Sequence, residues 1–259
     1  MAEVIYEKRD RVSYATLNRP HVHNALSPQL IEELGEVVAQ AGADEELRAL
    51  VIKGAGPSFS AGADLKFISE RGLEDPAGAL VPYIEKLNRV LFALEELPLA
   101  TVAVIHGYCL AGGLELAMAC DIVLAAEDAR IGDQHINFAL MPGGGNTQRL
   151  PRKLGWPRAM ALLLTGRWIT GKEAEAWGLV YKAVPADKLE EELESLLSDL
   201  RSKSRQALGQ IKRTALEGLN LPLSAAVRLE ISAASCYLAT SQDVREGLAA
   251  FLERRRPTF

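Results

Sequence analysis

The stretch GYCLAGGLELAMACD, residues 107–121, contains a carboxylate, Glu115, within an apolar run that favours a helix. Gly112 and Gly113 stand where that helix would begin. The N–H groups at a helix N-terminus lack partners inside the helix, and glycine lets a ligand approach them because it has no Cβ. We therefore predict an oxyanion-binding turn, with Glu115 in the first helical turn as a general acid or base. The structural alternative is a glutamate that only complements the helix dipole.

Strands and helices alternate around this stretch. Residues 11–20, RVSYATLNRP, alternate as in a half-buried strand, and residues 27–42 favour a helix with Ser27 as N-cap and Pro28 in its first turn. Further strands are predicted within residues 47–56, LRALVIKGAG, at residues 100–107, ATVAVIHG, and at residues 121–126, with helices at residues 81–94 and after Gly113. This alternation indicates an α/β fold.

Strand signals vanish from about residue 186 onward. Helical periodicity then predicts four segments, at residues 188–200, 204–217, 223–238 and 243–255. A helical region of this kind could form a subunit interface or pack back onto its own chain.

Composition limits the functional classes. The 259 residues are 48% hydrophobic and 24% charged, which is typical of a soluble globular protein. The charged N-terminus, MAEVIYEKRD, differs from a secretory signal, so we expect a cytoplasmic protein without a membrane span. A formal net charge of −5 argues against nucleic-acid binding, and the three cysteines lack the spacing of a metal site.

A second turn has similar features. Residues 56–67, GPSFSAGADLKF, pass from a strand end through small residues to a possible helix start at residues 63–66. This turn could also direct an N–H outward, although small-residue turns of purely structural function are common.

Together and in this order, these stretches resemble the enoyl-CoA hydratase/isomerase family, also called the crotonase family. The resemblance extends nearly from end to end, through ATLNRPHVHNAL, FSAGADLK, VIHGYCLAGGLELAMACDIVLAAEDARIG, MPGGGNTQRLPRKLG, LLLTGRWITGKEAEAWGLVYKAV and EGLAAFLERRRPTF.

The resemblance implies a spiral of ββα repeats followed by a C-terminal helical trimerisation region. Residues 1–200 would form the core with the acyl-CoA site, and residues 201–259 would form the oligomerisation region of a homotrimer or hexamer. The implied substrate is an acyl-CoA thioester whose carbonyl is polarised by two backbone N–H groups. No metal, flavin or nicotinamide cofactor is implied, because coenzyme A is part of the substrate.

The resemblance also implies site residues. Glu115 matches the first of two catalytic glutamates, and Ala63 and Gly112 match the oxyanion-hole donors. The positions that match substrate- or CoA-binding residues are Ala61, Ala63, Asp64, Leu65, Lys66 and Gly112, with Phe251 and Arg254 reaching CoA from a neighbouring subunit.

His135 departs from the family pattern. An ungapped count back from MPGGG, residues 141–145, gives His135 at the position of the second glutamate, whereas Asp133 would require a register slip. Imidazole exchanges protons near neutral pH, but it does not duplicate a carboxylate, because its protonated form only donates hydrogen bonds. His135 is therefore either a second catalytic residue or a packing residue. Asn146 also replaces a residue that is usually small and could alter the pocket wall.

The predicted reaction is hydration of a 2-enoyl-CoA, with a straight-chain or an alicyclic acyl group, or the reverse dehydration. Hydrolysis, ring opening or decarboxylation of an acyl-CoA would use the same oxyanion hole. Double-bond isomerisation is disfavoured by the missing second carboxylate. A noncatalytic acyl-CoA-binding protein is the alternative from another functional class.

Overall fold

Two β-sheets organise the part of the chain that the computed structural model describes, residues 2–72 and 74–259. A six-stranded sheet has the order β1-β2-β3-β4-β6-β9, and a three-stranded sheet has the order β5-β7-β8. The strands are β1 Val4–Arg9, β2 Val12–Leu17, β3 Ala49–Gly54, β4 Ala100–Ile105, β5 Tyr108–Leu110, β6 Ile122–Ala126, β7 Arg130–Gly132, β8 Ile169–Thr170 and β9 Lys182–Val184.

The large sheet is mainly parallel, and its central strands are buried. Strands β2, β3, β4, β6 and β9 run parallel to one another, whereas β1 joins the edge antiparallel to β2. Sequence alternation predicts a half-buried β2, but the structure buries almost all of it. The reason is that β1 and β3 flank this strand and helices cover the sheet, a packing that buries side chains on both faces.

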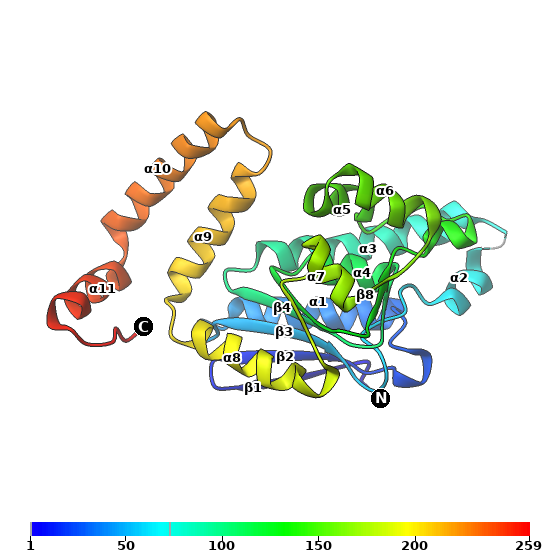
Figure 1. Ribbon diagram of the computed structural model, residues 1–259, viewed down its shortest axis with the longest axis horizontal. Helices are drawn as coiled ribbons and strands as arrows, with labels where there is room; N and C mark the ends of the chain where they lie inside the picture. The colour runs from blue at the N-terminus through cyan, green and yellow to red at the C-terminus, as the bar shows by residue number, and fades with distance from the viewer. Residues whose placement is uncertain (1, 73) are drawn as a thin grey trace.

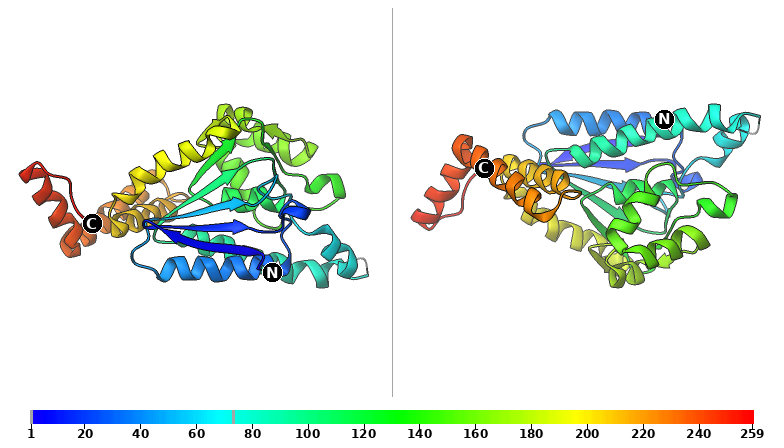
Figure 2. Two further views of the ribbon diagram at one scale, coloured as in Figure 1. Left: turned by 90° about the horizontal axis from the view of Figure 1, so that it is seen from below. Right: turned by 90° about the horizontal axis from the view of Figure 1, so that it is seen from above.

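Helices follow the strands and cover the large sheet. In Figure 2, α1 and α3 lie on one face of the sheet and α8 lies on the other. The helices are α1 Pro28–Ala43, α2 Leu65–Gly72, α3 Pro76–Glu96, α4 Gly112–Met118, α5 Asn146–Leu154, α6 Trp156–Thr165, α7 Gly171–Trp177, α8 Leu189–Arg201, α9 Arg205–Gly218, α10 Leu223–Thr240 and α11 Gln242–Glu253. The prediction for α1 is confirmed in detail, because Ser27 Oγ accepts the N–H of Leu30 and Pro28 opens the helix.

The four C-terminal helices predicted from periodicity are also confirmed as α8 to α11. Helices α9, α10 and α11 extend to one side of the sheet (Figure 1). Large apolar side chains on them, including those of Ile211, Leu223 and Phe251, are exposed. No helix within the described residues is long and apolar enough to cross a bilayer.

Lys212 fastens α9 to the core. Its Nζ lies 2.8 Å from Asp121 Oδ2 and donates to the carbonyl groups of Leu94 and Leu99 at 3.1 and 3.4 Å. Because the Lys212 side chain is mostly buried, these bonds replace hydration that the ammonium group would otherwise have.

We predict that Lys212→Met lowers the free energy of unfolding by about 1–3 kcal/mol, because Asp121 and two carbonyl groups lose their donor. Amide hydrogen exchange should report faster exchange in α9 than in the wild type. Arg213→Met, which changes an exposed cation on the same helix, is the control. Equal protection of α9 in both variants would contradict an anchoring role for Lys212.

Candidate active site

Helix α4 begins at the predicted glycine turn. Gly112 is its first residue, and Ala111 before it has the unusual φ of +48°. A Cβ at Gly113 would lie 2.6 Å from the carbonyl oxygen of Ser60, so only glycine fits there. The N–H of Gly112 has no acceptor within the helix because it belongs to the first turn. Glu115 lies in that same turn, as the sequence predicts.

Ala63 comes to α4 on a neighbouring loop. Ala63 forms an isolated parallel bridge with Leu26, whose N–H donates to Gly62 and whose carbonyl accepts from Asp64. In a parallel bridge of this kind, the residue between the two bonded neighbours, here Ala63, directs its own N–H away from the bridging strand, that is, away from Leu26. A methyl group built on Gly112 would lie only 3.4 Å from the Ala63 nitrogen. The two predicted oxyanion donors are therefore close neighbours.

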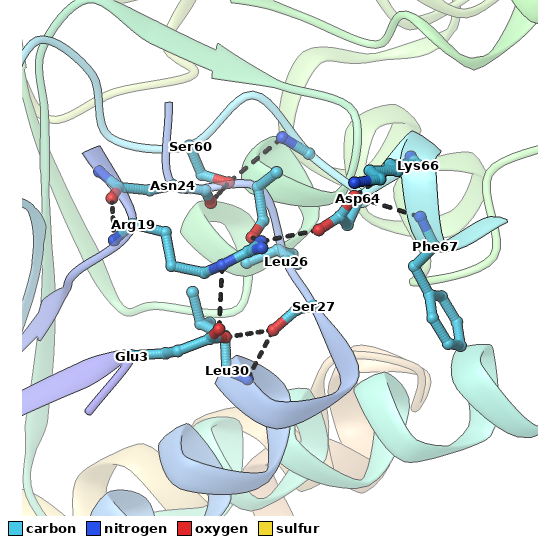
Figure 3. A network of polar contacts seen from close by, with 12 residues as sticks. Glu3, Arg19, Asn24, Leu26, Ser27, Leu30, Ser60, Asp64, Lys66 and Phe67 are labelled. Atoms are coloured by element: carbon cyan, nitrogen blue, oxygen red, sulfur yellow. Dashed lines mark hydrogen bonds and ion pairs between the residues drawn. The ribbon is translucent and has the colours of Figure 1, made fainter. Parts of the chain in front are cut away.

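A partly buried ion-pair network fixes the loop that carries Ala63 (Figure 3). Arg19 binds Glu3 Oε1 at 3.1 Å and Asp64 Oδ2 at 2.8 Å. The other oxygen of Asp64 accepts the N–H groups of Lys66 and Phe67 at the start of α2. Although burial opposes its ionised form, these bonds hold the pKa of Asp64 below its ordinary value. The carboxylate of Asp64 thus positions the turn next to Ala63.

One small cavity brings four predicted residues together. Its volume is about 50 Å³, and its wall includes Ala63, Gly112, Glu115 and His135. The rest of the wall is mainly apolar: Ile68, Leu80, Tyr83, Ile84, Leu87, Leu140, Met141, Gly143 and Gly144. A few polar groups thus line a mainly apolar space, as in sites that bind small molecules.

Glu115 is buried, with only 1% of its surface exposed. Its Oε1 accepts the N–H of Gly144 at 2.7 Å and that of Asn146 at 3.4 Å. A Cβ at Gly144 would lie 2.4 Å from Oε2, so glycine permits this approach. Burial raises the pKa of Glu115 to about 7, against the opposing charge of His135 and the two N–H bonds. The group can therefore exchange a proton near neutral pH.

His135 opens the short 3-10 helix η2, His135–Phe138, and is mostly buried. Its Nδ1 lies 3.0 Å from Asp133 Oδ1, which also accepts the His135 backbone N–H at 3.2 Å. Burial opposes the charged imidazolium, but the Asp133 bond and the charges of Asp133 and Glu115 outweigh it and raise the pKa of His135. Asp133 is fully buried, and its second oxygen accepts Asn146 Nδ2 at 2.7 Å. Asn146, expected in the pocket wall, thus supports Asp133.

The remaining predicted CoA residues are more dispersed. Ala61 lies in the loop before Ala63, and Leu65 and Lys66 have exposed side chains at the start of α2. Phe251 on α11 is 81% exposed, and α11 lies at the opposite end of the molecule from α2 (Figure 1). Helix α11, which carries Phe251 and ends at its C-cap Arg254, therefore lies away from α2, which contributes Ile68 to the cavity wall. Their assignment to a neighbouring subunit's site stays a prediction.

Sequence reasoning missed the roles of Gly144, Tyr83 and the Asp133–Asn146 pair. The glycine run at residues 143–145 was visible, but not its approach to Glu115. Tyr83 Oη donates to the carbonyl of Leu26 at 2.9 Å, beside Ala63, and no motif marks it. Within residues 2–72 and 74–259, no group of His, Cys, Asp and Glu side chains forms a candidate metal site.

Comparison with known proteins identifies the family. Residues 7–259 match the family model described as enoyl-CoA hydratase/isomerase. The chain belongs to this family. A probable mitochondrial enoyl-CoA hydratase of Dictyostelium discoideum is 37% identical over 98% of this chain and 89% of its own length. A crotonyl-CoA hydratase of Syntrophomonas wolfei is 35% identical over 99% of this chain and 97% of its own.

A solved structure supports the fold at the same level. The enoyl-CoA hydratase of Bacillus anthracis superimposes with a TM-score of 0.93 at 34% sequence identity, covering 99% of this chain and 98% of that one. The predicted crotonase-type α/β fold with a C-terminal helical region is therefore confirmed.

The raised pKa of Glu115 predicts how this site affects stability. Below about pH 4.5, the carboxyl is protonated in both the folded and the unfolded chain. Between about pH 4.5 and 7, the unfolded chain loses this proton while the folded chain keeps it, so the folded state becomes less stable as pH rises. Above pH 7 a constant cost of roughly 3 kcal/mol remains.

We predict that Glu115→Gln is more stable than the wild type by roughly 3 kcal/mol at pH 8 and no more stable at pH 4, because glutamine carries no charge. Urea unfolding across this pH range measures the difference. Glu217→Gln on α9, an exposed position, should change little at either pH. A Glu115→Gln variant less stable than the wild type at pH 8 would contradict the burial cost.

Proposed function

We propose that this protein hydrates the double bond of a 2-enoyl-CoA and catalyses the reverse dehydration. The observation that carries the proposal is one cavity whose wall includes Ala63, Gly112, Glu115 and His135. Two backbone N–H groups suit a thioester oxygen, and two titratable side chains suit the proton transfers of water addition. Family membership and the similarity to a crotonyl-CoA hydratase support the same reaction.

In the proposed reaction, the Glu115 carboxylate takes a proton from water while the water oxygen adds to C3 of the enoyl group. The C2=C3 electron pair moves toward the thioester, and negative charge develops on the carbonyl oxygen. The N–H groups of Ala63 and Gly112 stabilise this enolate. Protonated His135 gives a proton to C2, which completes a 3-hydroxyacyl-CoA. Transfer of the proton from Glu115 to His135 restores the starting state.

The protonation states of the pair support this assignment. With a pKa of about 7, Glu115 can lose its proton near neutral pH, and the carboxylates of Asp133 and Glu115 raise the pKa of His135 and so favour its imidazolium form. A base and an acid whose pKa values lie near the working pH transfer protons most effectively. Decarboxylation would depend on the oxyanion donors and has less use for such a pair.

The cavity wall suits an apolar acyl group. The side chains of Leu80, Ile84, Leu87 and Met141 line it together with the two titratable groups. A crotonyl group, the substrate named for the Syntrophomonas wolfei relative, is our first candidate substrate.

We also propose that α9 to α11 bind other copies of the chain, giving a homotrimer or hexamer. The exposed apolar side chains of Ile211, Leu219, Leu223, Leu248 and Phe251 support this, because such patches commonly mark interfaces. Within that assembly, Phe251 and Arg254 would contact the CoA of a neighbouring subunit, near Lys66. A cytoplasmic location stays a prediction.

We predict that Glu115→Gln lowers kcat for crotonyl-CoA hydration by roughly 10²–10⁴-fold, because the amide cannot accept the proton from water. Loss of the 2-enoyl thioester absorbance measures hydration, and isothermal titration with a saturated acyl-CoA should give a nearly unchanged Kd. Glu217→Gln serves as the matched control.

The assay should include crotonyl-CoA, a longer straight-chain enoyl-CoA and an alicyclic dienoyl-CoA. Hydration by the wild type and its loss in Glu115→Gln support the proposal. Binding of acyl-CoA without turnover of any of the three would contradict it and favour hydrolysis, decarboxylation or a binding protein.

A further inference from the structure

We propose that Asp133, held by Asn146, is a positioning residue that orients the His135 ring and stabilises its proton-donating form. This inference rests on the proposed function for its catalytic consequence. Its structural part, the state of the imidazole, holds independently of which acyl-CoA reacts.

The first support is the geometry at Asp133. This residue directly follows β7 and is fully buried, so its carboxylate lies where water cannot hydrate it. One oxygen, Oδ1, accepts both the side-chain Nδ1 and the backbone N–H of His135, at 3.0 and 3.2 Å. Two bonds from one residue fix the ring as well as the start of η2, which limits the orientations open to His135.

The second support is Asn146, which binds the other oxygen of Asp133. Its Nδ2 donates to Asp133 Oδ2 at 2.7 Å. If the Asn146 amide were turned over, its oxygen would face the Asp133 carboxylate and repel it, so chemistry determines which amide atom is the nitrogen. In this orientation, Asn146 Oδ1 has no hydrogen-bond partner among the described residues. The backbone N–H of Asn146 also faces Glu115 Oε1 at 3.4 Å. Asn146 thereby connects the supports of Glu115 and His135.

The consequence for the ring follows from its two nitrogens. With Nδ1–H donated to Asp133, Nε2 is the nitrogen that remains for the cavity and for the proton given to C2. Loss of that proton leaves a neutral ring whose remaining proton is on Nδ1. A buried carboxylate beside the ring favours the imidazolium before transfer and fixes the tautomer after it.

Two carboxylates act on the charge of His135. Asp133 faces it after β7, and Glu115 faces it from α4. On α5, Arg149 is bound by Glu95 at 2.7 Å and donates to the carbonyl of Gly144. Substitution of Asp133 therefore removes the closest negative charge to the ring and leaves Glu115 in place.

The first test follows the four histidine side chains of the full-length protein by ¹⁵N NMR across pH, with the His135 signal assigned from His135→Gln. In the wild type, neutral His135 should carry its proton on Nδ1. In Asp133→Asn, the pKa of His135 should fall while the titrations of His21, His23 and His106 stay unchanged. Asp121→Asn, a carboxylate with structural hydrogen bonds elsewhere, is the matched control.

The second test is the pH dependence of crotonyl-CoA hydration. The upper limb of kcat/KM reports loss of the His135 proton, so it should move to lower pH in Asp133→Asn and stay in place in Asp121→Asn. At pH 8, kcat should fall roughly tenfold or more with little change in KM, because proton transfer and not thioester binding is affected.

The outcomes separate the two proposals. An Nε2–H tautomer in the wild type, or a His135 pKa that Asp133→Asn leaves unchanged, would overturn the role of Asp133. The wild-type tautomer decides this even if Asp133→Asn does not fold. If the NMR results hold but no enoyl-CoA is hydrated, the positioning of His135 stands and the proposed reaction fails.

Discussion

The hydrogen bond from the Gly144 N–H to the buried Glu115 carboxylate is the contact on which the site depends. A carboxylate with 1% exposure is costly unless donors replace its water. Those donors come from the glycine segment before α5, and a Cβ at Gly144 would meet Oε2 at 2.4 Å. The glycine is thus needed for close approach. The N–H donors do not fully replace the water that the Glu115 carboxylate loses on burial. That residual cost is what raises the pKa of Glu115 into the neutral range.

Close backbone packing at glycines also shapes the proposed oxyanion turn. Gly62 and Gly112 let two loops approach until the Ala63 nitrogen lies next to α4, and the Leu26 bridge turns the Ala63 N–H toward the opposite side. The ion pair between Arg19 and Asp64, at 2.8 Å, then fixes the loop that carries Ala63. Donors that are already oriented need no reorganisation when charge develops, which is the main advantage of such a site. The Arg19–Asp64 ion pair, next to the cavity-lining Ala63, therefore holds the proposed oxyanion donor in place.

Sequence reasoning was most successful where structure is local. Ser27 and Pro28 mark the start of α1, and helical periodicity identifies α8 to α11, because capping and amphipathicity act over a few residues. It missed the three-residue strands β5 and β7, which are too short to have a period. It also missed the Asp133–Asn146 bond, because a contact across thirteen positions and a loop leaves no local pattern. The pairing of Glu115 with His135 was recognisable only through the resemblance.

Charge explains why His135 and Asp133 belong together. A pair of carboxylates that shares one proton carries a net charge of −1, whereas Glu115 with an imidazolium alone would carry none. With the Asp133 carboxylate beside the imidazolium, the three groups together carry a net charge of −1, as in such a pair of carboxylates. The imidazolium also gains a partner, which offsets the cost of burying a second charged group. Replacement of a glutamate by histidine is therefore compatible with acid–base chemistry when an aspartate lies behind the ring.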